Sequence, residues 1–171
     1  MDISTDAIKT VREQTGAGIM DCKRVLQEHN GDVEAAIEFL RERGHMIAKK
    51  KESRTADQGV IEAYIHGGGR IGVIIEVNCE SDFVARTPEF KELAHELAMQ
   101  VAATNPRYLG PEDRPEGEDP EEEDRLLLQP FIRDPQKTVN DIIAETIVKL
   151  RENIRIKRFA RFELGVDGQD A

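Results

Sequence analysis

Cysteine is scarce in this chain of 171 residues, which contains only Cys22 and Cys79. The two lie far apart, and neither has a second Cys or a His at metal-ligand spacing, so the sequence predicts neither a disulfide framework nor a metal site. Long apolar runs are lacking as well, because none approaches the roughly 20 residues that a membrane helix needs. The first residues, 1–6, do not have the pattern of a signal peptide either. We therefore expect a cytoplasmic protein that does not enter a membrane.

An excess of basic charge is also lacking. The chain has 24 basic and 34 acidic residues, a net charge of −10, which argues against bulk binding to nucleic acid. Hydrophobic residues make up 39% and charged residues 34%, a composition typical of a globular protein with a well-solvated surface. A chain of this length suits one medium domain or two small ones.

Most of the negative charge is concentrated in residues 111–124. This segment holds nine acidic side chains and one basic one, Arg114, so it contributes −8 of the net charge of −10. Three prolines and Gly117 are interspersed with the charges, which is typical of a mobile surface loop rather than a functional site. Basic residues gather instead in two other regions, 41–54 and 151–161.

The first 50 residues predict three short helices. Glycines separate the first helix from the second and the second from the third. Asp32 is suited to cap the third helix, whose apolar side chains recur at steps of three and four residues until Gly44, where we expect the helix to end. We therefore expect a three-helix domain over residues 1–50, with too small a core to be very stable alone, and a polar linker over residues 51–58.

The hydrophobic period changes after Gly59. Apolar residues alternate over residues 61–65 and again over residues 71–77. Between these two runs lies the turn sequence Gly67-Gly68-Gly69. This arrangement predicts a β-hairpin.

Two helices and a third strand follow the hairpin. Thr87 and Pro88 form a cap and first-turn pair that opens an amphipathic helix. Thr138 and Asp141 resemble a capping box that opens another helix. In the last strand, residues 154–164, we expect the apolar positions to face the core and the charged positions to face solvent. The expected core-facing residues are Ile154, Ile156, Ala160, Phe162 and Leu164, and the expected solvent-facing residues are Arg155, Lys157, Arg161 and Glu163.

Together these elements predict an α+β fold. An N-terminal three-helix domain is followed by a small antiparallel three-stranded sheet with helices packed on one face. The second domain is expected over residues 59–165 and includes the acidic loop over residues 111–124. Residues 166–171 are expected to form a flexible tail.

Candidates for catalysis are few. None of the four histidines, His29, His45, His66 and His95, lies near a Ser or Cys in a nucleophile motif, and no two have metal-ligand spacing. His95 falls beside the apolar stripe of its helix, so we interpret it as a surface residue. Gly67-Gly68-Gly69 lacks the Lys-Ser/Thr pair and the following helix of a phosphate-binding loop, so we interpret it as a turn. The sequence thus predicts no enzyme activity, no catalytic residue and no cofactor.

Two segments are not explained by the fold alone. In residues 15–23, Ile19 and Met20 are adjacent and cannot both point into one core, so one of them is a candidate for contact with a partner. In residues 78–86, Phe83 lies in a polar turn between the hairpin and the next helix. An aromatic in such a turn either fills the edge of a core or stands out as a binding anchor, and composition does not decide between the two.

Three motifs, taken in order, carry a resemblance to a known family. They read TGAGIMDCK at residues 15–23, EVNCESDFVAR at residues 76–86, and ENI at residues 152–154 followed by RFARFEL at residues 158–164. The chain resembles the elongation factor Ts family, the guanine-nucleotide exchange factors for elongation factor Tu, and the likeness covers nearly the whole sequence. Three long motifs in the family's order do not arise by chance.

The resemblance implies how the three-helix domain is used. In the family this domain is similar to a ubiquitin-associated domain and docks on the nucleotide-binding domain of elongation factor Tu. Ile19 and Met20 fall where the family places contact residues, usually two methionines. We therefore expect both to contact the partner and the departure at Ile19 to be mild.

The resemblance also implies the role of the second segment. Ser81, Asp82 and Phe83 correspond to the family's Thr-Asp-Phe signature, whose Phe wedges between two helices of the GTPase and disturbs its Mg²⁺ and phosphate sites. Ser81 keeps the hydroxyl group of the family's Thr and loses a methyl group. Asp82 is expected either to fix the turn or to meet polar groups of the GTPase. With the neighbouring Val84, these residues are the expected contacts with elongation factor Tu.

Two departures from longer family members affect the quaternary structure and the contacts. Longer members carry a second copy of the core and an inserted coiled coil, and this sequence has neither. A lone small sheet leaves its edges and apolar surface uncovered, so we expect a homodimer. The region after Tyr108 is compressed into the acidic loop, so contacts that relatives make there are not carried over.

Two other functions compete with this one. The three-helix domain alone would suit an adaptor that binds peptides or ubiquitin. The last strand, with Phe159 and Phe162 among basic residues, would suit a nucleic-acid platform, but only Phe159 is expected on the basic face. Single features of this kind are weak indicators of function, so no direct binding to nucleic acid is expected.

Overall fold

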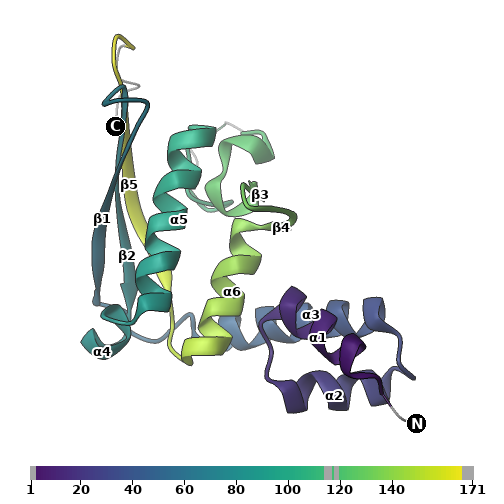
Figure 1. The fold of residues 1–171 in the computed structure, drawn as a ribbon. Coiled ribbons are helices and arrows are strands. Elements are labelled where there is room, and N and C mark those ends of the chain that lie inside the picture. The colour runs from purple at the N-terminus through teal and green to yellow at the C-terminus, as the bar shows by residue number, and fades with distance from the viewer. Residues whose placement is uncertain (1–2, 114–116, 118–119, 167–171) are drawn as a thin grey trace.

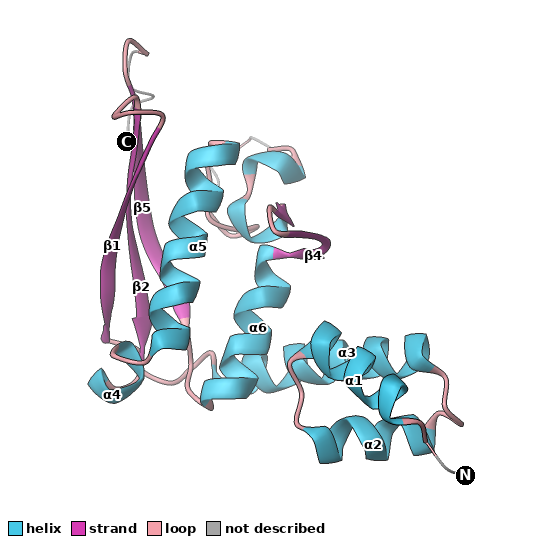
Figure 2. Cartoon of the chain, viewed as in Figure 1, coloured by secondary structure: helices cyan, strands magenta, loops and turns pink. Residues whose placement is uncertain are grey.

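The computed structural model describes residues 3–113, 117 and 120–166 of the chain (Figure 1). The architecture is the expected α+β fold, in which three N-terminal helices precede a three-stranded antiparallel sheet with helices packed against it (Figure 2). The helices are α1 (Thr5–Thr15), α2 (Ile19–Glu28), α3 (Val33–Lys51), α4 (Asp82–Ala85), α5 (Pro88–Thr104) and α6 (Val139–Leu150), and the short 3₁₀ turns are η1 (Glu122–Asp124) and η2 (Leu126–Leu128). The strands are β1 (Gln58–His66), β2 (Ile71–Cys79), β3 (Pro130–Phe131), β4 (Asp134–Thr138) and β5 (Arg155–Glu163).

Helices α1, α2 and α3, which we call the helical triplet, enclose a small core of their own. Ser4 accepts a hydrogen bond from the backbone N–H of Ala7 (3.1 Å) and so caps α1. Asp32 caps α3 in the same way by accepting from Ala35 (3.0 Å), as expected. Gly16, at φ 65°, ends α1 in the left-handed conformation that favours glycine. The buried core of the triplet consists of Val11, Cys22, Val25, Leu26, Ala36 and Leu40.

Helix α3 does not end at Gly44 as we expected but continues to Lys51. Gly44 is buried, and a Cβ atom placed on it would lie 3.8 Å from Cγ2 of Val148 on α6. The second half of α3 thus packs against α6, and this packing offsets the cost of about 1 kcal/mol for a glycine inside a helix. The expected end is wrong because the packing is not visible in the local sequence. The connection to β1 is therefore residues 52–57, and the division into domains at residues 51–58 stays a prediction.

The sheet has the strand order β1-β2-β5, and both pairs are antiparallel. The expected hairpin joins β1 to β2, and its turn, Gly67-Gly68-Gly69, has φ values of 61°, 67° and 90°, which favour glycine at each position. Helix α5 lies along one face of the sheet, and α6 packs beside α5 on the side away from the sheet (Figure 1). The residues buried between β2 and α5 include Val73, Ile75, Val77, Phe90, Leu93, Leu97 and Val101.

Strand β5 contains a β-bulge that we did not predict. Ile156 pairs with Val77. Arg158 pairs with the preceding residue, Glu76, so Lys157 is an extra residue in β5. An extra residue reverses the alternation of side chains on the strand beyond it. The expected facing is therefore confirmed before the bulge, where Ile156 is buried, and wrong after it, except that Glu163 at the end of the strand is exposed as expected.

Beyond the bulge the expected core and solvent faces of β5 are exchanged. Phe159 packs on the core, and the side chain of Arg161 is mostly buried and donates through Nε to the carbonyl oxygen of Ala102 (3.2 Å). We had expected both residues on the solvent face. Ala160 and Phe162, expected in the core, lie on the face turned away from α5, where Phe162 is 70% exposed.

The face of the sheet turned away from α5 is largely apolar, and we call it the outer sheet face. The pairing register aligns its residues in rows across β1, β2 and β5. The apolar residues that alternate over residues 61–65 face solvent there, and Leu164, expected in the core, is exposed just beyond β5. The large exposed apolar side chains of this face are Ile61, Ile65, Ile74 and Phe162, and its small residues are Ala63, Gly72 and Ala160. The row of Ile61 also holds the ion pair of Glu76 with Arg158 (2.8 Å).

Two expected segments fall partly outside the described residues. Of the acidic loop over residues 111–124, residues 114–116 and 118–119 are not described. Of the flexible tail over residues 166–171, only Val166 is described. The mobility of both segments stays a prediction.

The last residues of the acidic segment belong to the folded chain. Glu122–Asp124 form the turn η1. The carbonyl oxygen of Asp124 accepts hydrogen bonds from the backbone N–H groups of Arg107 and Tyr108, both at 2.9 Å. The turn η2 follows directly, with Leu126 fully buried, and a hairpin of β3 and β4 that we did not predict leads into α6.

Candidate functional site

The two segments that the fold alone does not explain include the start of α2 and the whole of α4. In Figure 1 these helices lie on opposite sides of the lower part of the molecule, α4 beneath the sheet and α2 in the helical triplet. Strand β2 ends at Cys79, and the chain turns at Ser81 into the four-residue helix α4. Phe83 on this helix is 79% exposed, whereas Ala85 is buried. Phe83 therefore does not fill the edge of the core, which was one of the two interpretations left open by the sequence.

Helix α4 is held at both ends by hydroxyl groups. Ser81 caps the start of the helix, because its Oγ accepts a hydrogen bond from the backbone N–H of Val84 (3.3 Å). At the other end, the hydroxyl of Thr87 donates to the carbonyl oxygen of Val84 (2.8 Å). The hydroxyl of Thr87 also accepts from the backbone N–H of Phe90 (3.3 Å) and so caps α5, as expected.

Asp82 helps to fix this turn. Its Oδ2 atom lies 2.8 Å from Nη2 of Arg86, one helical turn further on. The carboxylate is also half-exposed, so it remains accessible to a partner. Val84, in contrast, is partly buried against the core, and it is less accessible than Phe83.

Glu152 contacts the turn, although we assigned it no role from the sequence. Its carboxylate accepts hydrogen bonds from the hydroxyl of Ser81 (2.6 Å) and from the backbone N–H groups of Ser81 (3.0 Å) and Glu80 (3.1 Å). Glu152 belongs to the third motif quoted above. Nothing in the sequence indicates which backbone groups, more than 70 residues earlier, it would meet.

Cys79 is buried next to this turn. Burial raises the pKa of its thiol to about 11, and the negative charge of Glu152 acts in the same direction. The thiol is therefore neutral near pH 7, and it donates a hydrogen bond to the carbonyl oxygen of Ser81 (3.1 Å). Burial also raises the pKa of Cys22, and both cysteines are free. Neither has the character of a reactive thiol.

The first turn of α2 is the second exposed apolar site. Gly18 precedes the helix in an extended conformation (φ −64°, ψ 147°), so the helix begins at Ile19. Ile19 is 53% and Met20 77% exposed, whereas Cys22 and Val25 face the core of the triplet. Both side chains are thus accessible, although their adjacency alone led us to expect only one of them to be.

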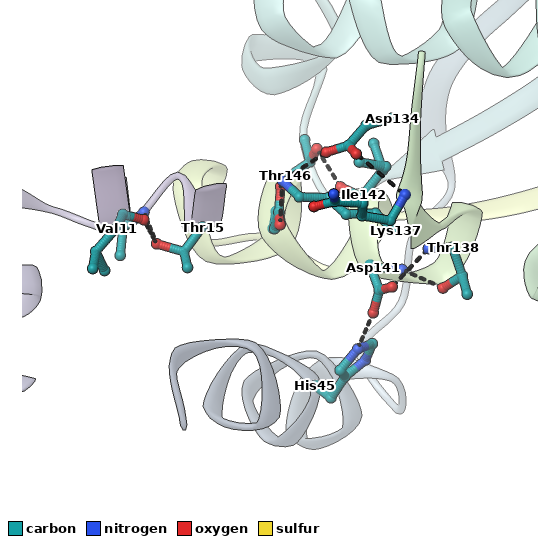
Figure 3. Close-up of polar contacts among 12 residues, drawn as sticks. Val11, Thr15, His45, Asp134, Lys137, Thr138, Asp141, Ile142 and Thr146 are labelled. Carbon is teal, nitrogen blue, oxygen red and sulfur yellow. Dashed lines mark hydrogen bonds and ion pairs between the residues drawn. The ribbon is translucent and has the colours of Figure 1, made fainter. Parts of the chain in front are cut away.

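The helical triplet is joined to the sheet-containing part of the chain through α3 and α6. Nε2 of His45 lies 2.6 Å from Oδ1 of Asp141 (Figure 3). Asp141 also closes the expected capping box, since its Oδ2 accepts the backbone N–H of Thr138 (2.7 Å) and Oγ1 of Thr138 accepts that of Asp141 (3.1 Å). Further along, Nζ of Lys51 donates to the carbonyl oxygen of Arg151 (2.9 Å), at the end of α6.

Within residues 3–113, 117 and 120–166, no cluster of three His, Cys, Asp or Glu side chains is placed to hold a metal ion. In the same part of the chain, no helix has the length and apolarity needed to cross a membrane. His95 is exposed, as expected, and its Nδ1 lies 2.8 Å from Oε1 of Glu62.

The two aromatic residues of β5 do not form a common platform. Phe159 packs on the core, whereas Phe162 lies on the outer sheet face. The basic side chain of Arg161 is mostly buried on the core side. These positions do not favour the nucleic-acid platform that competed with the main interpretation.

Comparison with known proteins connects these features to a family. The family model described as Elongation factor TS matches residues 3–124. The chain is 50% identical to elongation factor Ts of Caldanaerobacter subterraneus subsp. tengcongensis, over 95% of this chain and 97% of the relative. It is 46% identical to elongation factor Ts of Thermotoga neapolitana, over 98% of this chain and 100% of the relative. The chain belongs to the elongation factor Ts family.

Membership confirms the resemblance that the sequence motifs carried and makes the chain a translation elongation factor. The range that the family model matches includes both exposed sites, at residues 19–20 and 81–84. The alignment with the Caldanaerobacter relative spans 194 positions, more than the 171 residues of this chain. That relative therefore contains residues without a counterpart here, and any contacts they make are not carried over.

Proposed function

We propose that this chain is a guanine-nucleotide exchange factor that promotes release of GDP from elongation factor Tu during translation elongation in the cytoplasm. Its membership of the elongation factor Ts family supports nucleotide exchange on elongation factor Tu as the activity. The observation that carries the mechanism is Phe83, a large aromatic side chain that is 79% exposed on a short helix held at both ends. The proposal needs no catalytic residue or cofactor, since exchange makes and breaks no covalent bond.

In this proposal Phe83 enters the GTPase between two of its helices. In a GTPase, Mg²⁺ neutralises the diphosphate and the backbone amides of a loop surround it, so GDP leaves slowly. Displacement of these groups by the wedge weakens the binding of the nucleotide. By linkage, bound nucleotide weakens the binding of the exchange factor by the same free energy, so entry of a new nucleotide releases the factor.

Phe83 is not sufficient alone. Acceleration of release by about 10⁴-fold requires about 5.5 kcal/mol, whereas burial of one Phe supplies about 1.5–3 kcal/mol. The remaining binding free energy has to come from other contacts. Ile19 and Met20 offer a second accessible apolar surface for them. Because the α3–α6 junction joins the triplet to the rest of the chain, docking through α2 raises the effective concentration of Phe83 at its site.

The other residues of the turn are proposed to act with Phe83 in different ways. Ser81 uses its hydroxyl inside the protein, towards Val84 and Glu152, so its part is to shape the turn. Asp82 is half-exposed and meets polar groups of the GTPase. Val84 is partly buried and offers its accessible atoms to the same partner surface.

We propose further that two copies of the chain associate through the outer sheet face. Proteins rarely leave a contiguous apolar patch of this kind exposed, and two sheets pack well face to face with interdigitating side chains. A second copy is the proposed occupant, because longer family members carry the core twice and a two-fold pair presents the same patch from both sides. The side chains that this association would bury are Ile61, Ile65, Ile74 and Phe162.

The exchange activity is tested on elongation factor Tu loaded with a fluorescent GDP analogue. Release is followed after mixing with this chain and an excess of unlabelled GDP. The observed rate constant is expected to rise with the concentration of the chain to a plateau far above the spontaneous rate. A release rate that stays at the spontaneous value at every concentration would show the proposed function to be wrong.

A further inference from the structure

Three segments that are far apart in the sequence meet beside α4. They are the turn after β2, the connection from α6 to β5, and the connection from α3 to β1, which appear as loops at the lower end of the sheet in Figure 2. We call the residues that join them, Glu80, Ser81, Glu152 and Asn153, the clasp. The clasp lies directly before α4, the short helix that carries Phe83.

Glu152 makes the most contacts with the turn. Its Oε2 atom accepts hydrogen bonds from the backbone N–H groups of Glu80 (3.1 Å) and Ser81 (3.0 Å). Its Oε1 atom accepts the hydroxyl of Ser81 at 2.6 Å, and the oxygen of that hydroxyl accepts the N–H of Val84 (3.3 Å). Hydrogen bonds to a carboxylate are about twice as strong as those between neutral groups. Through Ser81, Glu152 is therefore connected to the first turn of α4.

The hydrogen bonds of the clasp also run in the other direction, from the backbone beside Glu152 to the side chain of Glu80. Oε1 of Glu80 accepts the backbone N–H of Asn153 at 2.6 Å and lies 3.5 Å from Nη1 of Arg54. Asn153 is buried, and its Nδ2 donates to the carbonyl oxygens of Glu52 (3.3 Å) and Arg54 (2.8 Å). The turn that carries Phe83 is thus tied to the connection that follows the helical triplet.

We infer that Glu152 is a positioning residue for Phe83 in nucleotide exchange, an inference that rests on the function proposed above. Helix α4 has four residues, too few to be stable by themselves. The ion pair of Asp82 with Arg86 is exposed and contributes at most about 1 kcal/mol. The Thr87 hydroxyl and the buried Ala85 hold the end of α4, and the hydrogen bonds to Glu152 fix its start, so Glu152 contributes to the direction in which Phe83 leaves the surface. Displacement of such a group by about 1 Å lowers a rate by as much as about 10²-fold.

The inference is tested by combining substitutions at positions 152 and 83. Glu152→Ala removes all three acceptor contacts, Glu152→Gln keeps one oxygen and the shape, and Glu92→Ala on the exposed face of α5 is the matched control. GDP release from elongation factor Tu is measured over a range of concentrations of each full-length variant. Each of the three substitutions is made both in the native chain and together with Phe83→Ala.

The expected result is a loss that depends on Phe83. In the native background, Glu152→Ala lowers the plateau rate by about tenfold or more, Glu152→Gln recovers most of that loss, and Glu92→Ala has no effect. Together with Phe83→Ala, Glu152→Ala has a further effect of less than about twofold, since the side chain that it positions is already gone.

A merely structural role of Glu152 predicts a different pattern. Loss of folded protein lowers the active concentration, so it raises the concentration that gives half-maximal exchange and leaves the plateau unchanged. A shift of the half-maximal concentration alone, or an equal loss of plateau rate with and without Phe83, overturns the inference.

A measurement without elongation factor Tu separates this inference from the proposed function. The chain contains no tryptophan, so Phe83→Trp introduces a single indole whose fluorescence anisotropy reports the mobility of the site. Glu152→Ala is expected to lower this anisotropy and Glu92→Ala to leave it unchanged, and an anisotropy that Glu152→Ala does not alter overturns the inference. If Phe83→Ala keeps full exchange activity while Glu152→Ala frees the indole, the wedge is wrong and the hold of Glu152 on position 83 is supported.

Discussion

Nε2 of His45 lies 2.6 Å from Oδ1 of Asp141, and this contact joins the helical triplet to α6. The α3–α6 junction thereby sets how the two accessible apolar sites, on α2 and α4, are placed relative to each other. Burial acts to raise the pKa of Asp141, but hydrogen bonds from Thr138 and His45 outweigh it and hold the pKa below its usual value. Asp141 is therefore an anion at neutral pH, where it serves both the cap of α6 and the contact with α3.

The protein is expected to lose stability in acid through Asp141. Because the pKa of this group is depressed in the folded state, its contribution is complete above the unfolded pKa of about 3.9 and is lost as the pH falls through the folded value. Asp141→Asn should lower the free energy of unfolding by about 1 kcal/mol at neutral pH, and this difference from the native chain should close in acid. Thermal unfolding at neutral pH and at about pH 3 measures the difference. Asp6→Asn, at an exposed position of α1, is the control, and a difference that is the same at both pH values contradicts the prediction.

Substitution of Met20 tests the second contact with elongation factor Tu. Met20→Ala should raise the concentration that gives half-maximal exchange about tenfold, because burial of a Met side chain contributes about 1.5–3 kcal/mol and about 1.4 kcal/mol is a factor of ten. The plateau rate should change little, since Phe83 remains. The free energy of unfolding should differ from that of the native chain by less than about 0.5 kcal/mol, because Met20 is exposed. Met46→Ala, at an exposed methionine of α3, is the control, and equal effects of the two substitutions would argue against a specific role of Met20.

Signals that lie within a few residues of each other correctly predicted most of the elements, whereas distant contacts account for the wrong end of α3 and the wrong facing in β5. Thr87-Pro88 indicated the start of α5, and Thr138 with Asp141 indicated the capping box of α6. Gly44 indicated a helix end that packing of α3 against α6 overrides. The bulge at Lys157 depends on the register between β5 and β2, which the alternation within β5 does not encode.

In the candidate site, too, a local motif indicated one residue, whereas another is recognised only from contacts between distant segments. Composition alone did not decide whether the side chain of Phe83 lies at the edge of the core or in solvent. The family motif indicated an exposed side chain, and Phe83 is exposed in the structure. Glu152 had no assigned role, because its partners are mostly backbone N–H groups, which nearly every residue has. A side chain that binds backbone groups of a distant segment is recognised only once the fold brings the two together.

Sedimentation tests the proposed homodimer. At micromolar concentration the native chain is expected to sediment as a species of twice 19.3 kDa. Phe162→Asp places a carboxylate on the outer sheet face and should give monomers, because burial of an unpaired charge is costly. Met46→Asp, at an exposed site on α3, should leave the dimer intact. A native chain that sediments only as a 19.3 kDa species rules out the dimer at that concentration.

Phe83→Ala is expected to separate exchange activity from stability. Because Phe83 is 79% exposed, its truncation should change the free energy of unfolding by less than about 0.5 kcal/mol, whereas truncation of a buried Phe costs about 3–5 kcal/mol. The plateau rate of GDP release should fall at least about tenfold, since even about 1.4 kcal/mol of lost wedge contact gives that factor. Phe162→Ala removes a similarly exposed aromatic from the outer sheet face and should keep the plateau rate. A folded Phe83→Ala protein with full exchange activity would end the proposal that Phe83 is the wedge.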